Sequence, residues 1–347
     1  SDIDALYRAR PAGRRVTVTM TNEALETHVV RSADLFIAAR QEGERVFVTP
    51  ERRFWATTRT VPPSVSCGPE GDCSDELAAF DGRERISVSD STDLAARENL
   101  DLTFETPPGG PCGLVIATRQ SLLSTYLFYQ ALAYMGRSAG EWLARLERGE
   151  AGVRRSFSAV DGLLGKIEVL VDRDGAWVPA GSTGEPGPLA TDVVLMPLAE
   201  VPSGPVRLRL RMTRGLHRID WVALVPLERE VTPERVPPSS VRRLDEPGPE
   251  LREVLIDSTR TLVTLPGDRY RLEYELPGEA TGYELFLVSR GYYLEWIREE
   301  WLEEENPLAL AQLLLSPAQT MRALAPAFKK VEPKMEASFW GSRYANP

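Results

Sequence analysis

Two histidines and three cysteines are the residues of this chain that most readily exchange protons or bind metals near neutral pH. His28 and His217 each stand just before a predicted strand. We interpret each as a turn histidine bonded to the backbone and not as a ligand or a general base. The sequence contains no GxSxG, HExxH, P-loop or GxGxxG pattern. We therefore predict no catalytic residue, no metal ligand and no cofactor, and we expect a protein that is not an enzyme.

The segment CGPEGDC places Cys67 and Cys73 at the two ends of a Gly/Pro loop. This spacing predicts a small disulfide-closed ring, worth roughly 2 kcal/mol in the chain-entropy model. Free thiols and a zinc site are the alternatives, and zinc lacks a second cysteine pair. A disulfide indicates an oxidising compartment. Cys112, in GGPCGLVIAT at the start of a predicted buried strand, is expected to be an inert core thiol.

Acidic residues offer the remaining route to catalysis. The segment DRDG at 172–175 is similar to the start of a calcium loop, but the further oxygen ligands are missing, and an Asp-Gly hairpin turn explains it as well. The 51 acidic residues could place a carboxylate pair for glycoside cleavage anywhere in the chain. Nothing singles out one pair, so a hydrolase with an unrecognised acidic site is the last functional alternative.

Aromatic side chains gather at two places near the end of the chain. Such rings suit a sugar-binding platform or a protein interface, and they suit core packing between sheet and helix equally. Tyr126, Phe128 and Tyr129 mark a comparable helix earlier in the chain, which favours packing. The candidate interaction residues are Tyr292, Tyr293, Trp296, Trp301, Phe339, Trp340 and Tyr344.

Charge and hydropathy exclude two classes of protein. The net charge of −10 argues against nucleic-acid binding, because phosphates require a positive surface. The most apolar stretch, 122–135, is too short and too polar to span a bilayer.

The chain begins SDIDALY, which we interpret as a processed or trimmed N-terminus. Together with the predicted disulfide, this favours an extracytoplasmic location, in the periplasm or at the cell surface.

Short landmarks recur in the same order in two parts of the chain, which predicts an internal duplication of about one hundred residues. The shared landmarks are VTVTMT at 16–21 and VRLRLRMT at 206–213, His28 and His217, VTPER at 48–52 and 231–235, VPPSV at 61–65 and VPPSS at 236–240, LTFETP at 102–107 and LEYELP at 272–277, and GLVIATRQSL at 113–122 and ELFLVSRGYY at 284–293.

The alternating strand patterns and the helical periods predict a mainly β fold of two related β-sandwich lobes with added helices. Caps at Ser138 and at Asn306-Pro307 mark helix starts, and Gly136 ends a helix. The expected organisation is a first sandwich copy at 1–118, a helical insertion at 119–163, a second copy at 164–291 and a helical tail at 292–347.

The segment 166–227 resembles the galactose-binding-like jelly rolls. The matching residues are Val206–Arg211, where arginine alternates with apolar residues, then Gly215, and then Ile219 and Asp220 before a final apolar strand. The resemblance implies a jelly-roll β-sandwich for the second copy and suggests glycan binding. The first copy has Val30 and Asp34 instead of the Ile-Asp pair.

Three functions follow from these observations. The first is a non-enzymatic β-sandwich scaffold or accessory subunit of a larger assembly, whose partners are other protein subunits or further copies of itself. The second is a protein of the carbohydrate-binding-module type, whose partner is a glycan. The hydrolase is the third.

Overall fold

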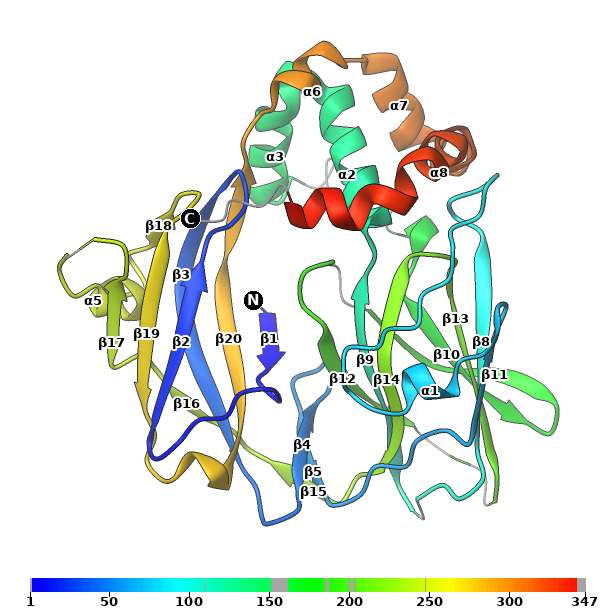
Figure 1. Ribbon diagram of the computed structural model, residues 1–347, viewed down its shortest axis with the longest axis vertical. Helices are drawn as coiled ribbons and strands as arrows, with labels where there is room; N and C mark the ends of the chain where they lie inside the picture. The colour runs from blue at the N-terminus through cyan, green and yellow to red at the C-terminus, as the bar shows by residue number, and fades with distance from the viewer. Residues whose placement is uncertain are drawn as a thin grey trace. The chain divides into compact units, whose positions relative to one another are not determined.

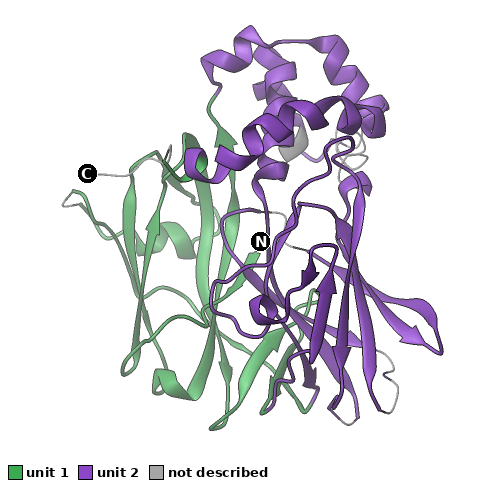
Figure 2. Cartoon of the chain, turned by 45° about the vertical axis from the view of Figure 1, so that its right-hand side comes forward, with its two compact units in different colours: residues 1–58, 228–296, 339–347 green, residues 59–227, 297–338 purple. Residues whose placement is uncertain are grey.

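The computed structural model describes residues 2–108, 110–150, 162–184, 187–198, 201, 204–246 and 248–341. The fold is mainly β, with antiparallel sheets and a helical C-terminal region, as predicted. The chain forms two compact units, shown in Figure 2. Unit 1 comprises residues 1–58, 228–296 and 339–347, and unit 2 comprises residues 59–227 and 297–338. No helix in the described part of the chain is long and apolar enough to cross a membrane.

Unit 1 is a β-sandwich in which one face of a sheet built on β3 and β20 packs against the ladder β17-β19-β2 (Figure 1). Its core includes Leu35, Leu272 and Tyr274. The strands are β1 (Asp2–Ala5), β2 (Arg15–Thr21), β3 (Glu26–Ala39), β4 (Arg45–Val48), β5 (Phe54–Thr57), β15 (Arg229–Val231), β16 (Glu234–Val236), β17 (Ser240–Arg243), β18 (Leu262–Thr264), β19 (Arg269–Glu275) and β20 (Tyr283–Glu295).

A second apolar cluster of unit 1 joins β4, β5 and β15 to β3 and β20. Phe54 and Phe286 meet edge to face there, with ring centroids 5.0 Å apart. Tyr7 packs on Phe286 and donates its hydroxyl proton to the Val46 carbonyl oxygen at 2.6 Å. The chain just after β1 is thereby fixed against the sheet.

Unit 2 contains a second β-sandwich, in which the sheet β11-β10-β13-β8-β6-β7 packs against β14, β9 and β12. Alternate residues of β8 and β13 face this core, as the period of two requires. The strands are β6 (Val65–Gly68), β7 (Gly71–Asp72), β8 (Arg97–Phe104), β9 (Cys112–Gln120), β10 (Ile167–Arg173), β11 (Ala176–Thr183), β12 (Asp192–Leu198), β13 (Val206–Thr213) and β14 (His217–Pro226).

Most of the helices belong to unit 2 and form their own apolar clusters. The predicted caps at Gly136 and Asn306 are confirmed: Gly136 ends α2 at φ 51°, and the Asn306 side chain accepts a hydrogen bond from Ala309 N at 3.0 Å. The helices of unit 2 are α1 (Ser74–Leu77), α2 (Leu122–Met135), α3 (Ala139–Glu147), α6 (Glu299–Glu303), α7 (Pro307–Leu315) and α8 (Pro317–Gly341), whose last residues are assigned to unit 1; α5 (Arg252–Ile256) lies in unit 1.

The predicted start of the helical tail at 292 is wrong. Strand β20 continues to Glu295, because β3 pairs with it along its whole length and places Tyr292 opposite Val29 and Tyr293 opposite His28. A bulge between Arg290 and Gly291 adjusts the register and lets the strand continue. Helix begins only at Glu299.

Each unit contains three neighbouring antiparallel strands that carry the predicted landmarks. When the landmark sequences of the two copies are aligned, equivalent residues are paired in both units. In unit 2, β8 lies between β13 and β6, and in unit 1, β19 lies between β2 and β17. The central pairs are Leu102 with Leu208 and Ser66 in unit 2, and Leu272 with Val18 and Val241 in unit 1.

The VPPS landmarks also share their local hydrogen bonds. Ser64 donates to the Thr103 carbonyl oxygen from its main-chain N at 2.7 Å and from Oγ at 2.9 Å. Ser239 makes the same two bonds, at the same distances, to Glu273. These matches support the duplication, which stays a prediction.

The compact units divide the chain differently from the predicted copies. Strand β2 of the first copy pairs with β19 of the second, and β13 of the second pairs with β8 of the first. Each unit therefore draws strands from both copies, and the chain changes unit near the two VTPER landmarks, after Thr58 and before Glu228.

Candidate functional site

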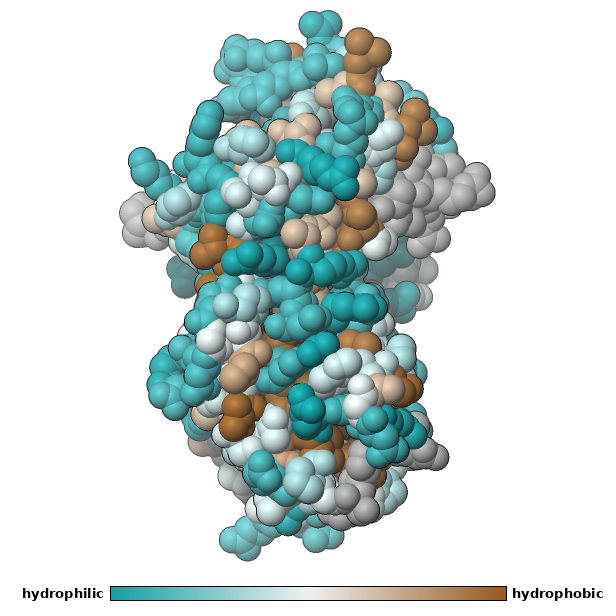
Figure 3. All heavy atoms as spheres, turned by 90° about the vertical axis from the view of Figure 1, so that its right-hand side faces the viewer, coloured by the Kyte–Doolittle hydropathy of each residue, from teal (hydrophilic) through white to brown (hydrophobic). Residues whose placement is uncertain are grey.

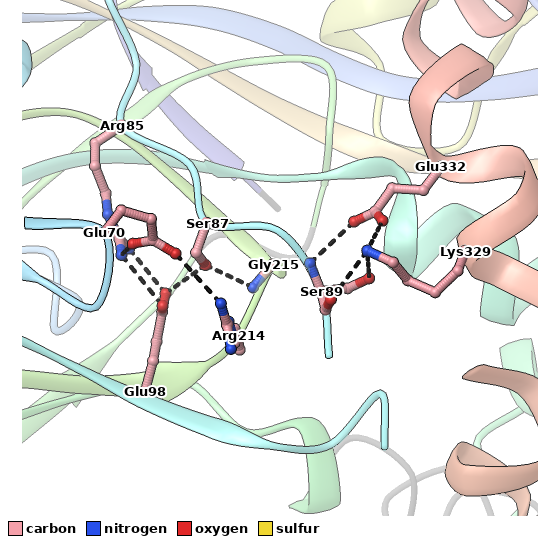
Figure 4. Close-up of polar contacts among 9 residues, drawn as sticks. All are labelled: Glu70, Arg85, Ser87, Ser89, Glu98, Arg214, Gly215, Lys329 and Glu332. Atoms are coloured by element: carbon pink, nitrogen blue, oxygen red, sulfur yellow. Dashed lines mark hydrogen bonds and ion pairs between the residues drawn. The ribbon is translucent and has the colours of Figure 1, made fainter. Parts of the chain in front are cut away.

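Several charged side chains of unit 2 form a largely buried network, drawn in Figure 4. Arg85, whose side chain is 5% exposed, bonds both carboxylate oxygens of Glu98, whose side chain is 1% exposed, at 2.8 and 3.1 Å. It also bonds Glu70 at 3.0 Å, and Arg214 lies 3.6 Å from the second oxygen of Glu70. Burial opposes the charged form of Arg85, but the hydrogen bond and charge of Glu98 outweigh it and raise the pKa of Arg85.

Main-chain geometry holds this network in place. Ser87 Oγ donates to Glu98 Oε1 at 2.7 Å and accepts from Gly215 N at 2.8 Å. Gly215 has φ 76°, and a Cβ there would lie 2.7 Å from the backbone of Ser89, so only glycine fits this close turn. The Gly215 of the jelly-roll resemblance therefore serves a packing role here.

Ser89, Lys329 and Glu332 are the nearest approach to a nucleophile with a base. Lys329 Nζ lies 3.5 Å from Ser89 Oγ and donates to the Ser89 carbonyl oxygen at 3.1 Å, while Ser89 N donates to Glu332 at 3.0 Å. A general base must be neutral to take a proton from a serine. Lys329 is instead engaged in an ion pair with Glu332. The trio joins helix α8 to the loop before β8, and Figure 4 shows these contacts.

A second network fixes α8 to β9 and β14. Glu84 accepts two hydrogen bonds from Arg119, at 2.6 and 2.7 Å, and lies 3.4 Å from Arg218. Arg218 also pairs with Glu336 of α8 at 2.8 Å. These charges compensate one another, and their ion pairs hold α8 against β9 and β14.

The two histidines differ in environment. His217 is the first residue of β14 and is buried, and neither ring nitrogen has a hydrogen-bond partner among the described residues. Burial lowers the pKa of His217 to about 4, helped by the charge of Arg97, so the ring is neutral near pH 7. His28 lies within β3 and bonds Glu26 at 2.5 Å. His28 is therefore bonded to a carboxylate within a strand, and it is not the turn histidine bonded to the backbone that we expected.

The predicted disulfide is not formed. Cys67, Cys73 and Cys112 are free. The β6–β7 hairpin pairs Cys67 with Asp72 and leaves Cys67 exposed, whereas Cys73 turns into the core and donates to Ser66 O at 3.6 Å. Burial raises the pKa of Cys73 and of Cys112 to about 11, so neither is an activated nucleophile. The three free thiols therefore give no support for an oxidising compartment.

The DRDG segment is the hairpin turn between β10 and β11. Asp174 and Gly175 have φ of 54° and 85°, and Gly175 N donates to Asp172 at 2.8 Å. Asp172 also pairs with Arg207 at 2.9 Å. Among the described residues, no group of three or more acidic, cysteine or histidine side chains is arranged to hold a metal.

Three of the predicted aromatic candidates lie at or just after the end of β20, in unit 1. Tyr292 lies under Arg31, Tyr293 meets His28 edge to face, and Trp296 Nε1 donates to Thr27 at 2.9 Å. Tyr293 is 52% exposed and Trp296 is 43% exposed. This end of β3 and β20 presents aromatic surface to solvent.

The other aromatic candidates are separate. Trp301 of α6 is buried against Tyr129, with ring centroids 5.6 Å apart, and Arg298 stacks on both rings, so it is a core residue of the helical part. Phe339 and Trp340 meet edge to face at the end of α8. Tyr344 lies outside the described residues.

Sequence reasoning missed the outer face of α7. Leu310 and Leu313 of this helix are buried, but Leu308 and Leu315 are 83% and 82% exposed. Ala311 lies between them on the same exposed stripe, at i, i+3 and i+7. Figure 3 shows hydrophobic side chains interrupting a largely hydrophilic surface over the helical part. The signal was present in LALAQLLL, which is apolar on more than one face.

The chain matches no family model and no curated protein. Among solved structures it matches the cryo-EM structure of the arabinofuranosyltransferase AftD from mycobacteria, at 12% identity and a TM-score of 0.24. The match covers 82% of this chain and 21% of that chain, so this chain spans about a fifth of its length. A similarity at this TM-score supports no conclusion about fold or function.

Proposed function

We propose that this protein is a non-enzymatic β-sandwich subunit that binds a protein partner through the outer stripe of α7. The single observation behind the proposal is the pair Leu308 and Leu315, each more than four-fifths exposed on one helix face. Burying a leucine side chain is worth about 1.5–3 kcal/mol, so a partner that covers both gains substantial free energy.

The position of α7 favours this role. Its opposite face is anchored by Leu310 and Leu313, and the Asn306 cap fixes its start. A helix with one face buried in its own unit and an exposed apolar stripe on the other can dock in a groove of a partner. The neighbouring α8 is fixed to the sandwich of unit 2 by contacts of Lys329 and Glu336.

Photo-crosslinking in the native source tests the proposal. A photoreactive amino acid in place of Leu308 is expected to crosslink to one protein in fixed stoichiometry, and the same group in place of Leu189 is the control. Leu189 is 51% exposed in the loop before β12 and belongs to the same unit.

The double substitution Leu308→Glu with Leu315→Glu should abolish co-purification of that protein without lowering the Tm, because both side chains already face water. A monomer that crosslinks to nothing at position 308, or to the same proteins from 308 and 189, would contradict the proposal.

A carbohydrate-binding role is the second candidate, and the exposed rings of Tyr293 and Trp296 favour it. Sugars stack on such rings. A glycan array is the test: a hit that disappears in Trp296→Ala would support it, and an array without hits would exclude it. For the hydrolase alternative, no arrangement in the described residues provides a favouring observation.

A further inference from the structure

Unit 1 contains a pocket of about 290 Å³. It lies where the segment after β1 meets the end of β3 and the start of β20, and three arginines line it: Arg10, Arg40 and Arg45. Pockets that hold small ligands begin at about 300 Å³. In a chain with a net charge of −10, a concave surface with three guanidinium groups is an exception to the overall charge.

Two of these arginines have no carboxylate partner among the described residues. Arg10 Nη1 donates to the carbonyl oxygens of Tyr7 and Ala9, at 3.0 and 2.9 Å. Arg40 donates from Nε to the Tyr283 carbonyl oxygen at 3.2 Å and from Nη1 to the Glu44 carbonyl oxygen at 3.0 Å. Carbonyl oxygens orient a guanidinium group without neutralising its charge.

The nearby carboxylates are already occupied. Glu284 pairs with Arg45 at 3.0 Å and also accepts from Val46 N at 3.3 Å. The Glu44 carboxylate pairs with Arg229 at 2.5 Å and accepts from Gln41 N at 2.7 Å, and the bond with Arg229 lowers the pKa of Glu44. Arg45 further lies 4.5 Å from the centre of the Tyr7 ring, which holds it in position.

The remaining wall is partly apolar, from Leu6, Pro11 and Leu285. From this arrangement we propose that the pocket binds a small organic anion, with Arg10 and Arg40 contacting its carboxylate or phosphate group and the apolar wall contacting its body. Guanidinium groups suit both anions because their N–H donors bind two oxygens at once. The proposal is independent of the partner proposed for α7.

Isothermal titration calorimetry at low ionic strength tests this with phenyl phosphate, benzoate and inorganic phosphate, and with neutral benzamide as the uncharged analogue. Saturable one-to-one binding of an aromatic anion but not of benzamide is expected. Tighter binding of phenyl phosphate assigns the pocket to phosphate esters, and tighter binding of benzoate assigns it to carboxylates.

Arg10→Gln and Arg40→Gln should each weaken the binding about tenfold or more, because each removes a charged hydrogen bond to the anion. Arg271→Gln removes the same charge from an exposed position of β19 in the same unit and should leave the affinity unchanged. If Arg40→Gln unfolds, the exposed Arg10 still allows the test. No saturable binding of any anionic probe, or equal weakening by Arg271→Gln, would overturn the proposal.

Discussion

Buried charges in unit 2 show how single residues are stabilised in this protein. Arg85 and Glu98 are removed from water, and each is compensated by a bidentate contact and by further groups, Glu70 and Ser87. Such a pair adds little net stability compared with an apolar pair, but removing one partner leaves an uncompensated buried charge.

Glu98→Gln should therefore destabilise the protein by about 3 kcal/mol or more, because Arg85 then has only the half-exposed Glu70 as a charged partner. Chemical denaturation measures the change. Glu275→Gln is the matched control, since Glu275 pairs with Arg15 on the surface and its loss should cost less than about 1 kcal/mol. Equal effects of the two substitutions would show that the Arg85 network is not buried as described.

His217 predicts a pH dependence of stability. Its pKa is about 4 in the folded protein against an ordinary value of 6.5, so the unfolded chain binds the extra proton between these values. The free energy of unfolding linked to neutral His217 is fully present above pH 6.5. It is lost as the pH falls toward 4, by roughly 3 kcal/mol in total.

His217→Leu should flatten this part of the stability profile, measured as the urea midpoint between pH 7 and pH 4. His28→Gln controls for loss of an imidazole alone. Parallel profiles for wild type and His217→Leu would refute the assignment. In that case His217 would not be buried as a neutral ring.

At the scale of elements, the long strand β20 determines which aromatic groups reach solvent. By continuing to Glu295 it pairs Tyr292 and Tyr293 with β3 and points their side chains to opposite faces of the sheet, so that Tyr293 is exposed and Tyr292 is half-buried. Strand β20 stays paired with β3 after the bulge because residue 291 is a glycine. A Cβ there would lie 2.4 Å from the Val29 carbonyl oxygen.

Gly291→Ala should therefore destabilise unit 1 by about 2 kcal/mol and expose the end of β20, since backbone atoms cannot yield as a flexible side chain can. Hydrogen exchange read by mass spectrometry should be faster at 292–295. Gly282→Ala is the control, because a Cβ at Gly282 meets no atom within 4 Å. Unchanged exchange in Gly291→Ala would mean that the close contact is absent.

At the scale of the whole molecule, each of the two sandwiches pairs strands that lie far apart in the chain. The ladder β2–β19 joins residues near 18 to residues near 272, and β8–β13 joins residues near 102 to residues near 208. Such long-range pairing makes neither half of the chain a complete sandwich. The matched registers of the two ladders are the pattern that a duplication with exchanged halves would produce.

Fragments 1–150 and 162–347 should therefore each be unfolded alone and should regain strand signal and a cooperative thermal transition when they are coexpressed. Circular dichroism and size exclusion of each fragment and of the pair provide the measurement. A cooperative transition in fragment 1–150 alone would show that the first copy folds by itself, as the sequence-based boundaries assumed.

The sequence by itself determined what depends on neighbouring residues. Alternation identified strands such as β2 and β13, Gly136 and Asn306 marked helix ends, and DRDG predicted a hairpin, because caps, turns and side-chain periods are local. The mainly β class followed from the same local patterns.

Only the tertiary structure decided the rest. Whether β20 continues past Gly291 depends on β3, which is about 260 residues away in the chain. Whether Cys67 meets Cys73 depends on which side of a hairpin each faces, and whether Leu308 is core or surface depends on which side of α7 the sandwich helices cover. The pocket of Arg10 and Arg40 could not be predicted from the sequence for the same reason. Whether each arginine of the pocket has a carboxylate partner depends on residues that meet only in the folded chain.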